Sequence, residues 1–232
     1  MDFIKQGINM EGLTKEILES HFEQLAQCTS HTLSDPVRKI ITLCDNVDKK
    51  DDSIKNIAEE AHQLLNIIKH IRQYAFLVLQ NPSYTIINTK NIIDEACHIL
   101  KDKAISEENI GHNLSNAPEF VGDCAQITDA FVELIENAIK FSNDKKVIIT
   151  YTEGNDSHIF SFANIGEKIN QIYLKNIFYL SIRGNNSAGI IGNGIGLACV
   201  KAVAENHKGR AWAETSKDGN IFFLSVSKDL VI

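Results

Sequence analysis

The sequence predicts an α+β protein, in which an N-terminal helical hairpin precedes a layer of helices on a mainly antiparallel sheet. Apolar residues up to about residue 80 recur at helical spacing with almost no glycine, and strand-like segments joined by a hairpin turn follow only later. The texture changes between Asn81 and Thr89. At one domain per ~150 residues, the 232 residues allow one large or two modest domains. We expect one domain at 1–84 and a second at 85–232.

Two long amphipathic helices are predicted in the first domain. In the first helix, apolar residues lie three or four positions apart: Leu33, Val37, Ile40, Cys44 and Val47. After a polar break at Asp48–Ser53, the second helix is expected over Ile54–Leu79, and Asn81-Pro82 ends it. Its apolar stripe contains Ile54, Ala58, Ala61, Leu65, Ile68, Ala75 and Val78. Because a lone hairpin cannot bury both stripes, we expect two copies to form a four-helix bundle, which makes the protein a homodimer.

The second domain mixes helices with hairpin-connected strands. A turn signal at Glu153–Asp156 separates two of the strand-like segments. The expected helices cover Ile92–Leu100, Ala125–Phe141 and Leu197–Asn206. The expected strands cover Val147–Tyr151, His158–Phe162, Arg210–Thr215 and Ile221–Val226.

Composition excludes several classes of function. The net charge is −7, and no concentrated basic stripe is present, which argues against nucleic-acid binding. The five cysteines are scattered without a CxxC pair, so neither a disulfide framework nor a zinc site is expected, and the compartment inferred is reducing and cytoplasmic. No apolar run approaches the ~18 residues of a membrane span, and no secretory signal is readable at the N-terminus.

The helix expected at Ala125–Phe141 carries a polar face. Glu133, Asn137 and Lys140 stand at positions i, i+4 and i+7, and Phe131, Leu134, Ile135 and Ala138 face the other way, towards a core. A carboxylate, an amide oxygen and an ammonium group on one face suit a magnesium–phosphate group, because the hard cation takes oxygen ligands. An ordinary solvated face with a favourable Glu–Lys arrangement is the alternative.

A glycine-rich loop, Gly189–Leu197, runs into the last predicted helix. Closely spaced glycines allow backbone N–H groups to approach an anion, and the helix N-terminus adds its dipole. The loop is not a Walker loop, because no Gly-Lys-Ser/Thr closes it. The residues before it, Arg183–Ala188, read as a loop rather than a strand, which disfavours a Rossmann turn. The stretch is more typical of a lid over a nucleotide.

Taken in order, these motifs resemble the ATP-binding domain of sensor histidine kinases. The resemblance depends on Glu133–Ser142, Asn164-Ile165-Gly166, Phe178, Gly192–Lys201, and His207–Arg210 with Trp212, and it covers roughly Ile92 to Val226. It implies a Bergerat-type α/β sandwich with ATP and Mg²⁺ as ligands. By the same resemblance, Asn137 holds Mg²⁺, Glu133 acts in catalysis and lines the phosphate side with Lys140, and the backbone of Gly192, Gly194, Gly196 and Leu197 cradles the phosphates. Asn164 and Gly166 belong to the motif that reads adenine.

The first domain contains a matching segment. Ser30–Ile40 resembles the phosphoacceptor segment of these kinases, in which a His is followed five residues later by Pro. His31 lies about 200° around the helix from Leu33, so it points away from the apolar stripe. Pro36 should bend the helix beside it. A neutral imidazole nitrogen exposed in this way can attack a γ-phosphorus, whereas the alternative is a His on an ordinary polar face.

The sequence departs from the family pattern at several positions. Thr32 replaces the usual acidic residue after the phosphoacceptor, and loss of a general base typically costs ~10²–10⁴-fold in rate. Asn164 stands where an adenine-reading Asp is usual; its carbonyl oxygen still accepts a hydrogen bond but without charge assistance. Lys168 replaces a glycine of that motif, and Ser181 replaces the second lid aromatic beside Phe178. Asp35 stands where many relatives carry the Thr or Asn used in dephosphorylating the partner.

The leading hypothesis is a cytoplasmic, dimeric protein-histidine kinase core that autophosphorylates His31 and passes the phosphoryl group to a receiver aspartate of a response regulator. One alternative is a histidine phosphotransferase that relays phosphate between receiver domains without using ATP. Another is a non-kinase ATPase of the same nucleotide fold, with Glu133 as the water-activating base. Residues 1–24 are too few for a sensory domain, so the signal arrives through a separate sensor protein or the chain is a fragment of a longer kinase.

Overall fold

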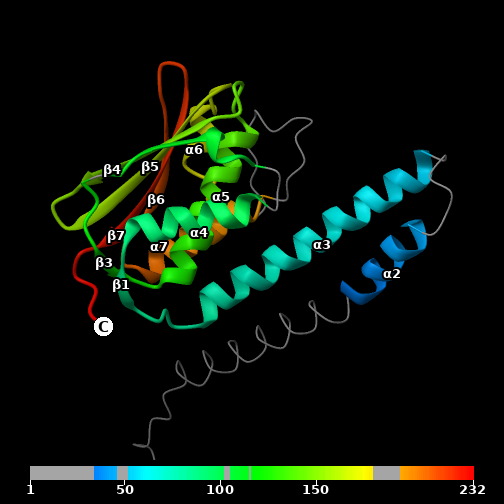
Figure 1. Ribbon diagram of the computed structural model, residues 1–232, viewed down its shortest axis with the longest axis horizontal. Helices are drawn as coiled ribbons and strands as arrows, with labels where there is room; N and C mark the ends of the chain where they lie inside the picture. Colours follow the sequence, from blue (N-terminus) through cyan, green and yellow to red (C-terminus); the bar gives the residue numbers. More distant parts are fainter. Residues whose placement is uncertain (1–33, 46–51, 102–104, 115, 180–193) are drawn as a thin grey trace, which may run out of the picture. The chain divides into compact units, whose positions relative to one another are not determined.

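The computed structural model describes residues 34–45, 52–101, 105–114, 116–179 and 194–232 (Figure 1). The chain divides into two compact units, Met1–Gln80 and Asn81–Ile232. The mixture of helices and strands predicted from the sequence is confirmed. No helix among the described residues is both long and apolar enough to span a bilayer.

The first unit contains two helices that pack against each other, α2 (Ser34–Asp45) and α3 (Asp52–Leu79). The predicted hairpin is visible in this part of the chain. The predicted single stripe of α3 is wrong at Val78, because the structure divides its apolar residues into two sets. Ala61, Ile68 and Ala75 are buried, whereas the following residues are exposed: Ile57, Leu64, Ile71 and Val78.

The second unit contains a five-stranded sheet in the order β2-β4-β5-β7-β6. Its strands are β2 (Ile110–Asn113), β4 (Val147–Glu153), β5 (Ser157–Ile165), β6 (Ala211–Thr215) and β7 (Gly219–Ser227). Only the β2–β4 pair is parallel, which agrees with the prediction of a mainly antiparallel sheet. A small antiparallel sheet pairs β1 (Thr85–Ile87) with β3 (Phe120–Gly122).

Helices α4 (Thr89–Lys101), α5 (Cys124–Lys140) and α7 (Gly196–Asn206) cover one face of the large sheet (Figure 1). Two short helices, η2 (Glu107–Asn109) and α6 (Gln171–Leu174), complete the described elements. The core between helices and sheet is built on Phe131 of α5, whose ring meets Phe160 and Phe162 of β5 edge-on, at 5.1 and 5.0 Å between centroids. All three side chains are fully buried, so α5 is held in a fixed rotation against the sheet.

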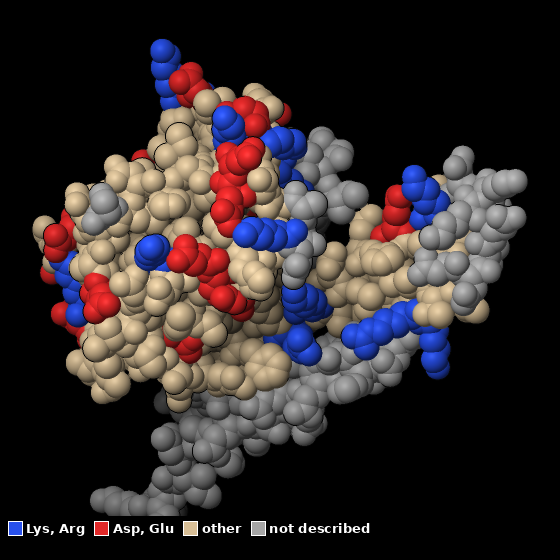
Figure 2. All heavy atoms as spheres, viewed as in Figure 1, with Lys and Arg blue, Asp and Glu red and all other residues tan. Residues whose placement is uncertain are grey.

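Charged side chains of both signs are interspersed over the second unit on the face shown in Figure 2. The described residues therefore form no large basic area on this face of the kind that nucleic-acid-binding proteins use. The predicted absence of nucleic-acid binding remains a prediction.

Candidate nucleotide site

The middle of α5 carries the polar residues predicted from the sequence. Phe131, Leu134, Ile135 and Ala138 are buried, as their spacing predicts. Glu133, Asn137 and Lys140 lie on the other face and are half-buried. Fixing one face of α5 in the core therefore fixes where the other face presents its carboxylate, amide and ammonium groups.

Gly196, the first residue of α7, lies directly against this polar face. A Cβ built on Gly196 would stand 2.1 Å from Glu133 Oε2 and 3.9 Å from Asn137 Nδ2. Any larger residue would displace the Glu133 carboxylate, and glycine leaves the first backbone N–H groups of α7 beside the α5 residues. Gly194, two residues earlier, has φ = 68°, a left-handed conformation that favours glycine. The structure thus brings Glu133, Asn137 and Gly196 together, and Leu197 follows as the half-buried second residue of α7.

A second group of polar atoms lies at the C-terminal end of β5. The side-chain Nδ2 of Asn164 donates a hydrogen bond of 3.1 Å to the carbonyl oxygen of Phe141. Asn164 is 5% exposed, and among the described residues its Oδ1 has no hydrogen-bond partner. A buried acceptor without a partner is costly, because desolvation is not offset by a hydrogen bond. An unpaired buried oxygen of this kind is suited to accept a hydrogen bond from a ligand.

Two glycines permit this second group to form. A Cβ on Gly166 would stand 2.2 Å from the Phe141 carbonyl oxygen, and a Cβ on Gly219 would stand 1.9 Å from the Asn164 carbonyl oxygen. Asn220 supports the loop that follows β5. Its Oδ1 accepts from Ile169 N at 2.9 Å, and its Nδ2 donates to Glu167 O at 2.8 Å. The sequence pattern did not identify Gly219 or Asn220, because nothing in their local spacing marks them as neighbours of Asn164.

The two groups are joined by the last turn of α5. Phe141 is the C-cap of this helix, and its N–H donates to the Asn137 carbonyl oxygen at 3.1 Å. Lys140 lies between them in sequence, with its Nζ 5.6 Å from the centre of the Phe141 ring. The arrangement combines a helix N-terminus that favours anions with a separate buried acceptor for an N–H donor. A molecule that has phosphates at one end and an exocyclic amino group at the other matches both groups.

Among the described residues, no group of three or more His, Cys, Asp or Glu side chains could hold a metal ion. The polar face of α5 nevertheless fits Mg²⁺, because this ion usually binds through one or two protein oxygens together with substrate phosphates and water. The Cys199 thiol lies in α7 close to this site, and burial, with smaller contributions from Glu133 and Asp129, raises its pKa to about 12. A buried thiol of this kind is not a candidate nucleophile.

Several predicted positions lie outside the described residues: His31, Thr32, Ser181 and Gly192. Phe178, the single predicted lid aromatic, is described and buried, and its ring lies 6.5 Å from that of Phe222.

Comparison with known proteins shows which class of protein this chain is similar to. Residues 122–230 match the family model described as histidine kinase-, DNA gyrase B-, and HSP90-like ATPase. This segment is therefore similar to the ATPase domains of that family. Together with the relatives below, the match confirms the predicted resemblance to a sensor histidine kinase catalytic core.

Several curated relatives are similar along most of the chain. The phytochrome-like protein Cph1 of Synechocystis is 24% identical, covering 96% of this chain and 32% of its own length. The adaptive-response sensory-kinase SasA of Prochlorococcus marinus subsp. pastoris is 28% identical, covering 93% of this chain and 60% of its own. The chain thus spans less than two thirds of the length of these relatives.

Solved structures show the same fold. Full-length ShkA in complex with AMPPNP matches with a TM-score of 0.67 at 17% identity, over 90% of this chain and 47% of its own. Histidine kinase ThkA in complex with the response regulator protein TrrA matches with a TM-score of 0.62 at 18% identity, over 96% of this chain and 68% of its own.

Proposed function

We propose that this chain is the core of a two-component protein-histidine kinase that uses Mg-ATP to phosphorylate His31 and passes the phosphoryl group to a response-regulator aspartate. The observation that carries the proposal is the buried, unpaired Oδ1 of Asn164, which lies at one end of a site whose other end is formed by Gly196 beside Glu133 and Asn137. The first end suits the adenine amino group, and the second suits the phosphates.

Each residue has a role in this proposal. Asn137 supplies an oxygen ligand for Mg²⁺, Lys140 neutralises phosphate charge, and the backbone of Gly192–Leu197 donates hydrogen bonds to phosphate oxygens. Bound Mg²⁺ lowers the electrostatic cost of the charge that develops on the phosphates. Glu133 lies at the phosphate side, where it acts with the phosphoacceptor. A neutral nitrogen of His31 forms the new bond to the γ-phosphorus, and ADP leaves.

The proposal includes a homodimer, a receiver-domain partner and a cytoplasmic location. The exposed residues Ile57, Leu64, Ile71 and Val78 of α3 support the homodimer, because they repeat every seven residues as in a helix-bundle seam. The four described cysteines are free thiols, which agrees with a reducing compartment. A separate sensor protein, or a sensory part of a longer chain, supplies the signal.

Incubation with γ-labelled ATP and Mg²⁺ tests the reaction. We expect acid-labile label on the wild type, none on His31→Ala, and transfer of the label to a receiver domain. Label that persists on His31→Ala overturns the assignment of the phosphoacceptor. Binding of ATP with steady phosphate release and no phosphoprotein favours the non-kinase ATPase, and phosphate exchange with receiver domains without ATP binding favours the relay phosphotransferase.

Gly196→Ala tests the phosphate end of the site. The added methyl group would meet the Glu133 carboxylate, so we expect calorimetry to show affinity for Mg-ATP weakened by at least about 10-fold. Gly111→Ala is the matched control, because its Cβ would meet no atom closer than 3.7 Å. Equal affinity in the two variants would contradict the proposed place of the phosphates.

A further inference from the structure

A hydrogen-bonded cluster at the opposite end of α5 from Asn137 centres on Asp123, the N-cap residue of this helix. Its Oδ1 accepts from the N–H of Gln126 at 3.1 Å, which caps α5. Its Oδ2 accepts from the N–H of Ser83 at 2.8 Å. One carboxylate therefore fixes the start of α5 and also holds a backbone group of the segment that precedes β1.

The backbone N–H of Asp123 continues the cluster into the C-terminal end of α7. It donates to Nε2 of His207 at 2.8 Å, and the other ring nitrogen, Nδ1, lies 2.7 Å from the carbonyl oxygen of Val203. A ring that accepts at Nε2 and donates at Nδ1 is the neutral tautomer. His207 is fully buried, and this burial lowers its pKa.

Tyr84 contacts the same end of α7. Its hydroxyl donates to the carbonyl oxygen of Asn206, and its ring centre lies 5.6 Å from that of His207. The side chain of Asn206 in turn donates to Gln126 Oε1 at 3.0 Å. We call these six residues the α5–α7 clamp: Ser83, Tyr84, Asp123, Gln126, Asn206 and His207.

The clamp and the candidate nucleotide site lie at two ends of one antiparallel helix pair. α7 begins with Gly196 against Glu133, and it ends with Asn206 and His207 at the start of α5. Glu133 follows Asp123 by ten residues, or about 15 Å of helix. Because close-packed interiors transmit strain, a shift of α7 against α5 at the clamp also changes how Gly196 meets Glu133.

We propose that Ser83 and Tyr84 are positioning residues for the nucleotide site and act on it through Asp123 and Asn206. This inference rests on the proposed function, because it assumes that Glu133, Asn137 and Gly196 hold the phosphates. Ser83 and Tyr84 follow α3 within five residues, so the chain that leaves the helical hairpin connects directly to the clamp. A change in this connecting segment alters the affinity for nucleotide without any contact to the nucleotide.

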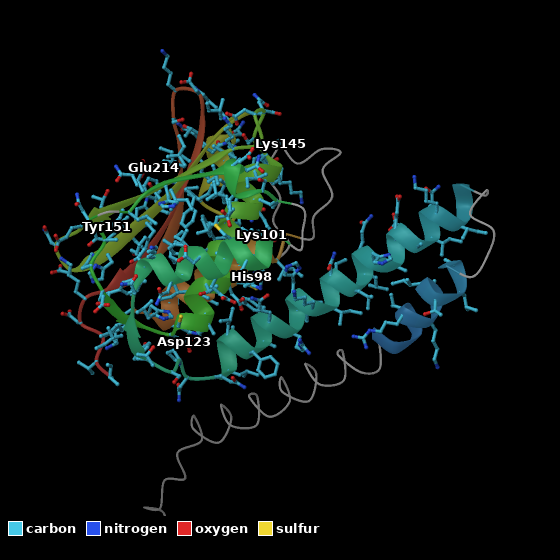
Figure 3. All side chains as sticks on the ribbon, in the orientation of Figure 1. His98, Lys101, Asp123, Lys145, Tyr151 and Glu214 are labelled. Atoms are coloured by element: carbon cyan, nitrogen blue, oxygen red, sulfur yellow. The ribbon has the colours of Figure 1, made fainter. Side chains whose placement is uncertain are left out.

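Tyr84→Phe tests the proposal in the full chain, because it removes the hydroxyl and keeps the ring. We expect its affinity for Mg-ATP, measured by calorimetry, to fall about 3- to 10-fold. Tyr151→Phe is the matched control: the Tyr151 hydroxyl also has one partner, His158 Nδ1 at 3.0 Å, and lies elsewhere in the second unit (Figure 3 labels Tyr151 and Asp123). Equal losses of stability with unchanged nucleotide affinity in both variants would show that Tyr84 is only structural.

Asp123→Ser separates the cap from the connection to Ser83. Serine is as good an N-cap as Asp, but its single, shorter-reaching oxygen cannot accept from both N–H groups. Stability should therefore remain close to wild type while the affinity for Mg-ATP falls.

Amide hydrogen exchange without nucleotide gives an independent measurement. Exchange at residues 133–137 and 196–200 should rise in Tyr84→Phe and not in Tyr151→Phe. Unchanged exchange at these residues would overturn the positioning role of Ser83 and Tyr84, whether or not the wild type binds ATP. A wild type that binds no ATP would by itself overturn only the proposed function.

Discussion

At Asn164, the orientation of one amide group decides what the site can bind. The Phe141 carbonyl can only accept, so the Asn164 Nδ2 must face it and the Oδ1 is left for a ligand. The sequence predicted that Asn164 retains an acceptor where relatives carry Asp. It could not predict the partner, because a backbone carbonyl leaves no trace in residue type. Helical periodicity predicts Phe141 only as the end of a helix.

Asn164→Asp should destabilise the second unit at neutral pH. A carboxylate has no hydrogen to donate, so two oxygens would face each other in a buried place, and we expect the free energy of unfolding to fall by about 1–3 kcal/mol at pH 7.5. At pH 5 the difference from wild type should shrink, because a protonated carboxyl can donate to the Phe141 carbonyl. Urea unfolding at both pH values measures this, with the exposed Asn155→Asp as control. A variant as stable as wild type at pH 7.5 would contradict the hydrogen bond.

Buried His207 should make stability depend on pH. Burial lowers its pKa, an effect that the hydrogen bond to Val203 and the charge of Asp123 only partly oppose. Below the ordinary value of about 6.5, the unfolded chain binds a proton that the folded chain does not, so stability falls as pH falls from about 6.5 towards the lower folded pKa. Burial, with a smaller contribution from Lys228, lowers the pKa of His158 as well, in the same direction.

We therefore expect the urea midpoint to be steady between pH 7 and 8 and to drop between pH 6.5 and 5. His207→Gln removes one titrating group, so its midpoint should fall less steeply with pH, although the variant is less stable at pH 8. An unchanged slope in His207→Gln would show that this imidazole does not contribute.

At the scale of elements, α3 presents two apolar seams. The buried Ala61, Ile68 and Ala75 repeat every seven residues, and so do the exposed residues on the neighbouring face: Ile57, Leu64, Ile71 and Val78. One hairpin buries only the first seam, and of the predicted stripe only Val78 belongs to the exposed second seam. The second seam has the spacing of a coiled-coil contact.

Leu64→Glu with Ile71→Glu should convert a dimer into monomers. Burying a Leu or Ile side chain contributes about 1.5–3 kcal/mol, and each substitution occurs twice in a dimer, so the dissociation constant should rise by at least about 100-fold. Sedimentation equilibrium measures the change, and far-UV circular dichroism checks that helices remain. Ile148→Glu, which changes an exposed isoleucine of β4, should leave the dimer intact. A wild type that is monomeric at all concentrations would remove the basis for the proposed bundle.

Long elements with strong periodicity were predictable, and short ones were not. The helix predicted at 125–141 is α5 at 124–140, because nine buried residues mark its face. The sequence did not predict β1, β2 or β3, which have three or four residues each. Their stability comes from partners far along the chain, such as Gly122 opposite Thr85, and no local pattern encodes such a pairing.

At the scale of the whole molecule, the site is predictable as a set of residues but not as an assembly. Spacing placed Glu133 and Asn137 on one helix face, and the glycine loop indicated an anion site. Their meeting at Gly196 depends on how α7 packs on α5, which follows from the core beneath both helices. The clamp is still harder to predict from the sequence, since it joins Tyr84, Asp123 and His207 from three distant segments.

Two compact units in one chain should unfold in two separable steps. The single tryptophan, Trp212 in β6, stacks on Phe223 at 4.7 Å, so its fluorescence reports the second unit. At 100 times its dissociation constant, Mg-ATP should stabilise that unit by about 2.7 kcal/mol and shift only the tryptophan transition. Dilution of the protein should shift only the remaining helical transition, seen by far-UV circular dichroism, because the proposed dimer forms through the first unit. If both treatments move one coincident transition, the units fold as a single cooperative body, and the helical hairpin and the nucleotide site would share one stability rather than communicate through residues 83 and 84.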